Sequence, residues 1–167
     1  MSERSLTNTV YIRTTADDLW HALTNGDLSV QYVGARVQST WRPGDEIVYL
    51  SPDGSTRLVE GTLLEVEPKH RFVFECRLLM DPALAADRPH RETFEIEDLG
   101  DVCRCTATFD HYAPDSPTLR FQGQGSMPMC GSSLKSLLET GHPLEFRHAK
   151  MNESATARES HVAARSA

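Results

Sequence analysis

The chain has 167 residues, of which 39% are hydrophobic and 25% charged, the composition of an ordinary globular protein with one domain. Its 17 basic and 24 acidic residues give a formal net charge of −7, which would repel a phosphate backbone, so we expect no nucleic-acid partner. It has no signal-peptide core and no apolar run near the roughly 18 residues of a membrane span, so we expect no membrane insertion and a cytoplasmic location.

The first segment predicts a strand followed by two short helices. Val10 and Ile12 alternate with polar side chains, which is typical of a half-buried strand. Thr15 is placed to cap a helix that carries two aspartates in its first turn and ends at Asn25-Gly26. A second helix is predicted over residues 28–33, closed by Gly34. Trp20 is interpreted as an anchor between the first helix and the sheet.

The middle of the chain predicts an antiparallel meander. Strong turn signals, Arg42-Pro43-Gly44-Asp45 and Ser51-Pro52-Asp53-Gly54, separate segments of alternating hydrophobicity. Along the last three strands the apolar side chains share one parity and the charged ones the other, so one face of the sheet needs a cover. The six predicted strands are 37–41, 46–50, 56–66, 71–79, 90–97 and 102–111, and 81–89 is predicted to be a loop.

A helix over residues 126–140 is predicted to be this cover. Five apolar residues recur at helical spacing, and Gly141 followed by Pro143 ends the pattern. The predicted apolar face is Met127, Cys130, Leu134, Leu137 and Leu138, and the predicted polar face is Ser132, Ser133, Lys135, Ser136 and Glu139. We therefore expect one α+β domain over residues 1–144, and residues 145–167 have little to bury and are expected to form a disordered tail.

This order of elements resembles the START/SRPBCC helix-grip (Bet v 1-like) superfamily, and within it the branch homologous to the activator of heat-shock-protein-90 ATPase. The resemblance runs from about residue 8 to 144. The stretches that carry it are 10–24 (VYIRTTADDLWHALT), 41–44 (WRPG), 61–68 (GTLLEVEP) and 134–141 (LKSLLETG). It implies a curved antiparallel sheet closing with the long helix around an apolar cavity, used across the superfamily for lipids, sterols, polyketides and hormones, and occasionally for catalysis.

The residues expected to bind a ligand in this cavity are mostly aromatic and apolar side chains of the inward-facing columns. They are Trp41, Phe72, Phe74, Phe94, Phe109, His111, Met127, Cys130 and Leu134. The segment 121–129, which has two glycines and two methionines just before the long helix, is a candidate gate.

Four polar residues are candidates for catalysis, although none forms a known motif. His90 and Glu92 begin a predicted strand with the parity of Phe94, but strand ends fray, and we favour a solvated Glu92 over a buried one. His111 and Tyr112 end the last strand, where we favour an ordinary edge histidine over an acid–base group. No nucleophile elbow, zinc-binding helix or phosphate loop is present.

The same reasoning predicts no metal and no cofactor. His90, Glu92 and His111 could form a two-histidine-one-carboxylate set, but nothing in their spacing demands it. No Cys-x-x-Cys pair exists, and the four cysteines are interpreted as reduced structural thiols.

Three functions remain open at this point. We favour binding of a small hydrophobic ligand, such as a lipid, polyketide or aromatic metabolite, without catalysis. The alternatives are a cyclase- or hydrolase-type enzyme that uses the same cavity, and a chaperone-interacting module. The identity of the ligand is not encoded in any motif, and a homodimer is left open.

Overall fold

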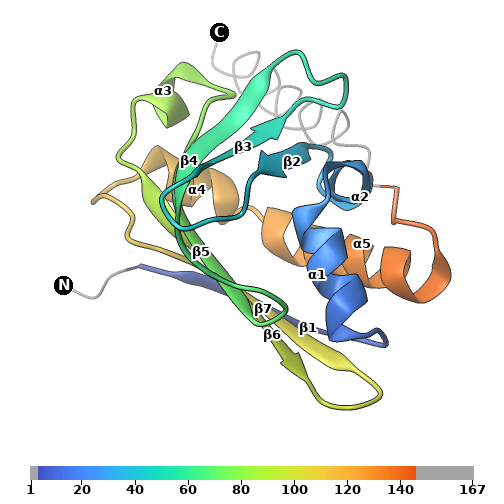
Figure 1. Cartoon of the computed structure of the whole chain (residues 1–167). Coiled ribbons are helices and arrows are strands. Elements are labelled where there is room, and N and C mark those ends of the chain that lie inside the picture. Colours follow the sequence, from blue (N-terminus) through green and yellow to red (C-terminus); the bar gives the residue numbers. More distant parts are fainter. Residues whose placement is uncertain (1–3, 146–167) are drawn as a thin grey trace, which may run out of the picture.

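A curved antiparallel sheet forms the body of the protein, as the computed structural model in Figure 1 shows for residues 4–145. Its seven strands follow the order β1-β7-β6-β5-β4-β3-β2. The strands are β1 (Leu6–Ile12), β2 (Arg36–Ser39), β3 (Glu46–Leu50), β4 (Arg57–Glu67), β5 (Arg71–Leu78), β6 (His90–Asp98) and β7 (Cys103–Asp110). The α+β helix-grip prediction is confirmed, while the predicted tail from 145 lies, apart from its first residue, outside the described residues.

Two short helices follow β1, as predicted. Thr15 caps α1 (Ala16–Thr24), because its hydroxyl accepts a hydrogen bond from the Asp18 amide. Asn25 caps α2 (Gly26–Tyr32) in the same way, and this cap makes α2 begin two residues before the predicted start. In Figure 1 both helices lie with α5 (Ser126–Thr140) on one face of the sheet.

Helix α5 occupies the predicted residues and ends at Gly141, whose φ of 80° is the left-handed conformation that glycine adopts without strain. Met127, Leu134 and Leu137 are buried, as the apolar pattern predicts. The predicted polar face is wrong at Ser133, which is 1% exposed. Its hydroxyl accepts a hydrogen bond from the amide of Leu144, so the segment after α5 covers this serine.

Two further short helices are present that the sequence pattern does not predict. Helix α3 (Pro82–Ala85) lies inside the predicted loop 81–89, and α4 (Pro117–Gln122) precedes α5. The Ser116 hydroxyl caps α4 and also donates a hydrogen bond of 2.5 Å to the Asp87 carboxylate. The amide of Thr118 donates to the same carboxylate. These bonds hold α4 against the segment that precedes β6.

An aromatic group fills the sheet face beneath the helices. Phe72, Phe74 and Phe94 stack nearly parallel, with ring centroids 5.0–6.3 Å apart. Trp20 and Trp41 meet Phe72 edge-on, which confirms the prediction that Trp20 joins α1 to the sheet. None of the helices within residues 4–145 is long and apolar enough to span a membrane.

Candidate functional site

A cavity of about 330 Å³ lies between the sheet and helices α2, α4 and α5. Its volume is near the lower end of the usual range for small-molecule pockets. Apolar side chains of the sheet and of α5 supply most of its wall. The polar side chains on the wall are Asn8, Tyr32, Tyr49, Glu92, Gln122 and Ser126.

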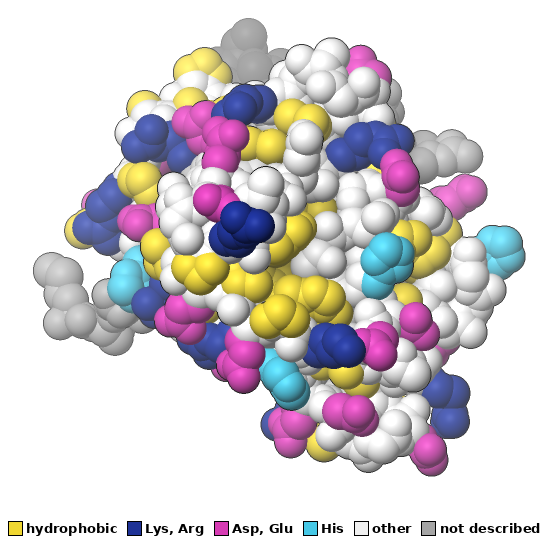
Figure 2. All heavy atoms as spheres, in the orientation of Figure 1, with side chains coloured by type: hydrophobic (Ala, Val, Ile, Leu, Met, Phe, Trp, Pro, Cys, Tyr) yellow, Lys and Arg dark blue, Asp and Glu magenta, His cyan; other side chains and the backbone are white. Residues whose placement is uncertain are grey.

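The cavity opens to solvent beside α4. Met80 and Phe121 line it and are also 46% and 42% exposed, which places them at its mouth. Figure 2 shows hydrophobic side chains across the centre of one molecular face, with charged side chains around them. Phe121 belongs to the segment 121–129 predicted as a gate, but this segment is largely helical, because α4 and α5 include most of it.

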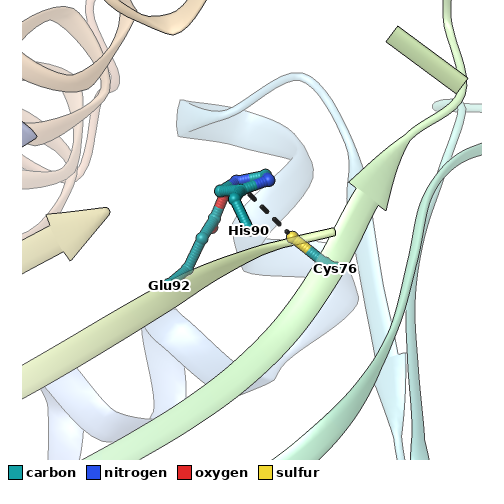
Figure 3. A group of neighbouring side chains, drawn as sticks. All are labelled: Cys76, His90 and Glu92. Atoms are coloured by element: carbon teal, nitrogen blue, oxygen red, sulfur yellow. Dashed lines mark hydrogen bonds and ion pairs between the residues drawn. The ribbon is translucent and has the colours of Figure 1, made fainter. Parts of the chain in front are cut away.

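A buried polar cluster borders the cavity, and its central pair is His90 and Glu92 (Figure 3). The two residues are separated by one position on β6, so their side chains leave the same face of the sheet. The His90 Nε2 atom lies 2.9 Å from the Glu92 Oε1 atom, and the residues are 1% and 8% exposed. Of the pair, only Glu92 is part of the cavity wall.

Three neighbours complete the cluster. Cys76 stands opposite His90 in the β5–β6 register, with its Sγ atom 3.7 Å from His90 Nε2. The Gln122 side-chain amide donates a hydrogen bond of 3.0 Å to Glu92 Oε1. The Tyr112 hydroxyl donates one of 2.5 Å to Gln122, and its ring stacks on His90 at a centroid distance of 5.1 Å. The network thus fixes the direction of the Glu92 carboxylate.

The thiols near the cavity are in environments that disfavour the thiolate. Burial raises the pKa of Cys105 to about 12 and that of Cys130 to about 11. Burial and the neighbouring Glu92 carboxylate raise the pKa of the Cys76 thiol well above its ordinary value. The free thiols therefore act as small apolar groups near neutral pH rather than as nucleophiles. All four cysteines are unpaired.

Six of the nine predicted ligand-binding residues line the cavity, and three do not. Those in the wall are Phe72, Phe94, Phe109, Met127, Cys130 and Leu134. Trp41 packs instead against Trp20 and Phe72. Phe74 is fully buried beneath its aromatic neighbours, where it is core. His111 lies outside the wall, because the backbone turns at this residue with a φ of 62° and leaves the side chain 46% exposed.

Of the four catalytic candidates, three belong to the buried polar cluster and one is exposed to solvent. The favoured expectation of a solvated Glu92 is wrong, because α4 covers this end of β6 and buries the carboxylate. His90 contacts Glu92, and Tyr112 reaches it through Gln122. His111 is exposed, which fits an edge histidine, and it cannot complete the metal set considered with His90 and Glu92. The Cys76 sulfur, rather than the His111 ring, lies beside His90 and Glu92.

Sequence reasoning missed Gln122 and the place of Cys76 at this site. Gln122 is the last residue of α4, a helix too short to show a hydrophobic period. The pair Ser116-Pro117, an N-cap followed by proline at the first helical position, is the signal that would have found α4. Cys76 has the parity of Phe72 and Phe74 on its strand, but its pairing with His90 depends on a register that the pattern does not specify.

Comparison with solved structures identifies the fold. Protein MLL2253 from Mesorhizobium loti has a TM-score of 0.66 at 22% identity, covering 81% of this chain and 96% of that one. The Aha1 dimer from Colwellia psychrerythraea has a TM-score of 0.65 at 13% identity, covering 83% and 98%. DynU16, described as a protein of the dynemicin biosynthetic locus, has a TM-score of 0.67 at 17% identity, covering 85% and 49%. No curated protein matches the sequence.

The sheet, the covering helix and the cavity between them define a helix-grip protein of the SRPBCC type. The model of the family "Activator of Hsp90 ATPase homolog 1-like protein" matches residues 13–139, and the chain belongs to this family. The suspected branch is confirmed. Both the fold and the family leave the particular ligand or activity undetermined, because one fold carries many functions.

Proposed function

We propose that the protein binds a small, mostly apolar molecule with one hydrogen-bonding end in the cavity beneath α5. The observation that carries the proposal is the cavity itself: apolar side chains form most of its wall, and a few polar side chains, among them the hydrogen-bonded Glu92 and Gln122, interrupt it. Its volume of about 330 Å³ favours a compact aromatic or polyketide-like molecule over a two-chain lipid. The likeness to a protein of the dynemicin biosynthetic locus supports this class of ligand.

The polar groups of the wall indicate what the ligand's polar end is like. The Tyr49 hydroxyl lines the cavity and has no hydrogen-bonding partner among residues 4–145, so it is available to a ligand. The Glu92 carboxylate accepts hydrogen bonds and is partly engaged by His90 and Gln122. A ligand hydroxyl or amine that reaches this end would satisfy both groups, whereas a ligand carboxylate would be repelled by Glu92.

The test combines ligand identification with a blocked cavity. Protein purified from its native host is extracted and searched by mass spectrometry for a co-purifying small molecule. The neutral fluorescent probe N-phenyl-1-naphthylamine is then titrated into the wild-type protein and into Ala107→Phe. Ala107 lines the cavity, so the added ring fills the space a ligand needs, and we expect probe binding to fall at least about tenfold.

The matched control is Thr108→Phe, which adds a ring to the next residue of β7, on the opposite face of the sheet. This variant should bind the probe like the wild type. Probe binding that survives in a folded Ala107→Phe protein, or that is lost equally in both variants, would contradict the proposal.

A catalytic use of the same cavity is the second candidate function, and the buried contact between His90 and Glu92 at the wall is the observation that favours it. In this case Glu92 takes a proton from the ligand and His90 orients and supports the carboxylate. Wild-type protein and Glu92→Gln are incubated with the identified ligand, and products are sought by mass spectrometry. Product formed only by the wild type supports catalysis, and unchanged ligand in both argues for binding alone.

Location and assembly are further parts of the proposal. We place the protein in the cytoplasm, which its four unpaired cysteines favour. The neighbour from Colwellia psychrerythraea is described as a dimer, and this supports a homodimer for the present chain. Light scattering after size-exclusion chromatography gives the mass directly, and a monomer mass at high protein concentration would contradict the dimer.

A further inference from the structure

The side chains of Cys76, His90 and Glu92 converge on one point beside the cavity (Figure 3). One atom from each, namely a sulfur, a ring nitrogen and a carboxylate oxygen, lies within 4.8 Å of both others. All three residues are buried and come from the paired strands β5 and β6. Because the ladder fixes the backbone under them, their convergence depends on the rigid part of the fold rather than on a loop.

The distances are close to those of a tetrahedral metal site. Bonds of about 2.3 Å to sulfur and about 2.0–2.2 Å to nitrogen and oxygen would separate sulfur from nitrogen by about 3.6 Å and nitrogen from oxygen by about 3.4 Å. The distances are 3.7 Å from Cys76 Sγ to His90 Nε2 and 2.9 Å from His90 Nε2 to Glu92 Oε1. Shifts of about 0.5 Å would bring the three atoms to the spacing that a zinc-like ion requires.

Hydrogen bonds already connect the three side chains. The His90 Nε2 atom faces both the sulfur and the carboxylate, and one ring nitrogen carries at most one hydrogen. The Cys76 thiol carries a hydrogen of its own and donates it to Glu92. A cation at the common point would interact favourably with all three atoms, because metal coordination also deprotonates the thiol.

The surroundings supply the other parts of such a site. Gln122 donates to Glu92 and is itself held by the Tyr112 hydroxyl, which is the kind of outer partner that orients metal ligands. Glu92 is also part of the cavity wall. A metal with three protein ligands keeps a fourth position for water or for another ligand atom.

We propose that Cys76, His90 and Glu92 form a binding site for one divalent transition-metal ion of the zinc type. The mixed sulfur, nitrogen and oxygen set excludes magnesium and calcium, which prefer oxygen ligands alone. The two proposals can fail separately, because metal binding is measured without a cavity ligand and probe binding is measured in the presence of a chelator.

The test uses Co²⁺ alone as the probe on the full chain, stripped by a chelator and reduced. We expect one equivalent to bind, with a thiolate-to-cobalt charge-transfer band and the intense visible bands of tetrahedral cobalt. Zn²⁺ should displace it. X-ray absorption of the zinc-loaded wild type should show one sulfur and two to three nitrogen or oxygen neighbours around the metal. This measurement uses the wild-type protein alone, so it does not depend on whether any variant folds.

Single substitutions test which side chains bind the metal ion. Cys76→Ser should remove the charge-transfer band, and Glu92→Gln should weaken binding at least about tenfold. Gln122→Leu should weaken it about 10- to 100-fold, as expected for an outer partner. The matched control is Cys105→Ser, which removes another buried thiol from the sheet and should leave the band unchanged. Absence of a stoichiometric band in the wild type, or a band that survives in Cys76→Ser, would overturn the proposal.

Discussion

The two ends of the cavity are built on different physical principles. At one end Phe72 and Phe94 stack at 5.0 Å, with Phe74 behind them, and the contacts are apolar and not directional. At the other end His90, Glu92 and Gln122 hold one another by hydrogen bonds of 2.9–3.0 Å. Packing tolerates small displacements, whereas a buried polar network loses much of its favourable energy when one partner is removed.

The two ends contribute different properties: the apolar end contributes mainly stability, and the polar end mainly selectivity for what is bound. The apolar end contributes to the stability of the domain through its buried area, at roughly 25 cal/mol per Å². The polar end contributes less net stability, because its groups must give up water before they pair. It determines instead which atoms a bound molecule or ion can present. Substitutions at the apolar end should therefore lower the free energy of unfolding more than substitutions at the polar end.

The largest effect is expected at the apolar end. Phe74→Ala removes a fully buried ring that contacts Phe72, Phe94 and Tyr49, and it should lower the free energy of unfolding by about 3–5 kcal/mol. Urea denaturation measures the change. Leu64→Ala on the neighbouring strand is the control, because Leu64 is 44% exposed and should change stability by less than about 0.5 kcal/mol. Equal losses in both would contradict the assignment of the core.

The next effect is expected where the sheet backbone approaches the polar end. A Cβ at Gly61 would lie 2.3 Å from the Glu75 carbonyl and 2.8 Å from the Cys76 Cβ, so Gly61→Ala should cost about 1–3 kcal/mol. Gly131→Ala on α5 is the comparison. There the new methyl group meets the movable end of Asn8, and alanine favours the helix, so stability should stay equal or rise. Thermal unfolding of both variants checks that Gly61→Ala is the less stable of the two.

A smaller effect is expected from the hydrogen bonds of the polar end. Tyr112→Phe keeps the ring on His90 but removes the donor to Gln122, and it should cost about 1 kcal/mol. Gln122→Leu should cost slightly more, because it also removes a donor to Glu92. The double variant should be less destabilised than the two single changes together, since both break one network. Strict additivity in urea denaturation would show that the network is not coupled.

The smallest effect is expected at Asp87, which holds α4 in place. Burial acts to raise its pKa, but hydrogen bonds from Ser116, Thr118 and Arg88 outweigh this and lower it. A lowered folded-state pKa stabilises the fold above the unfolded value of about 3.9, and this contribution is lost as the pH falls. Asp87→Asn should therefore flatten the decline in stability below about pH 5, by less than about 1 kcal/mol. An unchanged pH profile would contradict this role.

Most of the apolar end could be predicted from the sequence. Alternation on β5, β6 and β7 placed Phe72, Phe94 and Phe109 inward, and helical spacing placed Leu134 above them. Trp41 and His111 were misplaced, because both sit where the backbone adopts a positive φ and leaves the strand direction. Periodicity carries no information beyond the last regular residue of a strand.

The polar end could be predicted only in part. Parity placed Glu92 inward, but the expectation of solvation was wrong because α4, its cover, has too few residues for a pattern. The segment between β5 and β6 contains α3 instead of a tight turn, so its length does not fix which residue of β5 faces His90. A network of this kind depends on register, which the sequence pattern leaves open.

The strand order has a consequence for how the protein forms during synthesis. Strand β1 leaves the ribosome first, yet its sheet partner is β7, and Leu6 pairs with Phe109 across more than half of the chain. The first strand must therefore wait, unpaired, until residues 103–110 have been made. Contacts so distant in sequence slow folding. A nascent chain that stalls before β7 leaves β1 exposed as a free edge, the form most open to capture by a chaperone or to aggregation.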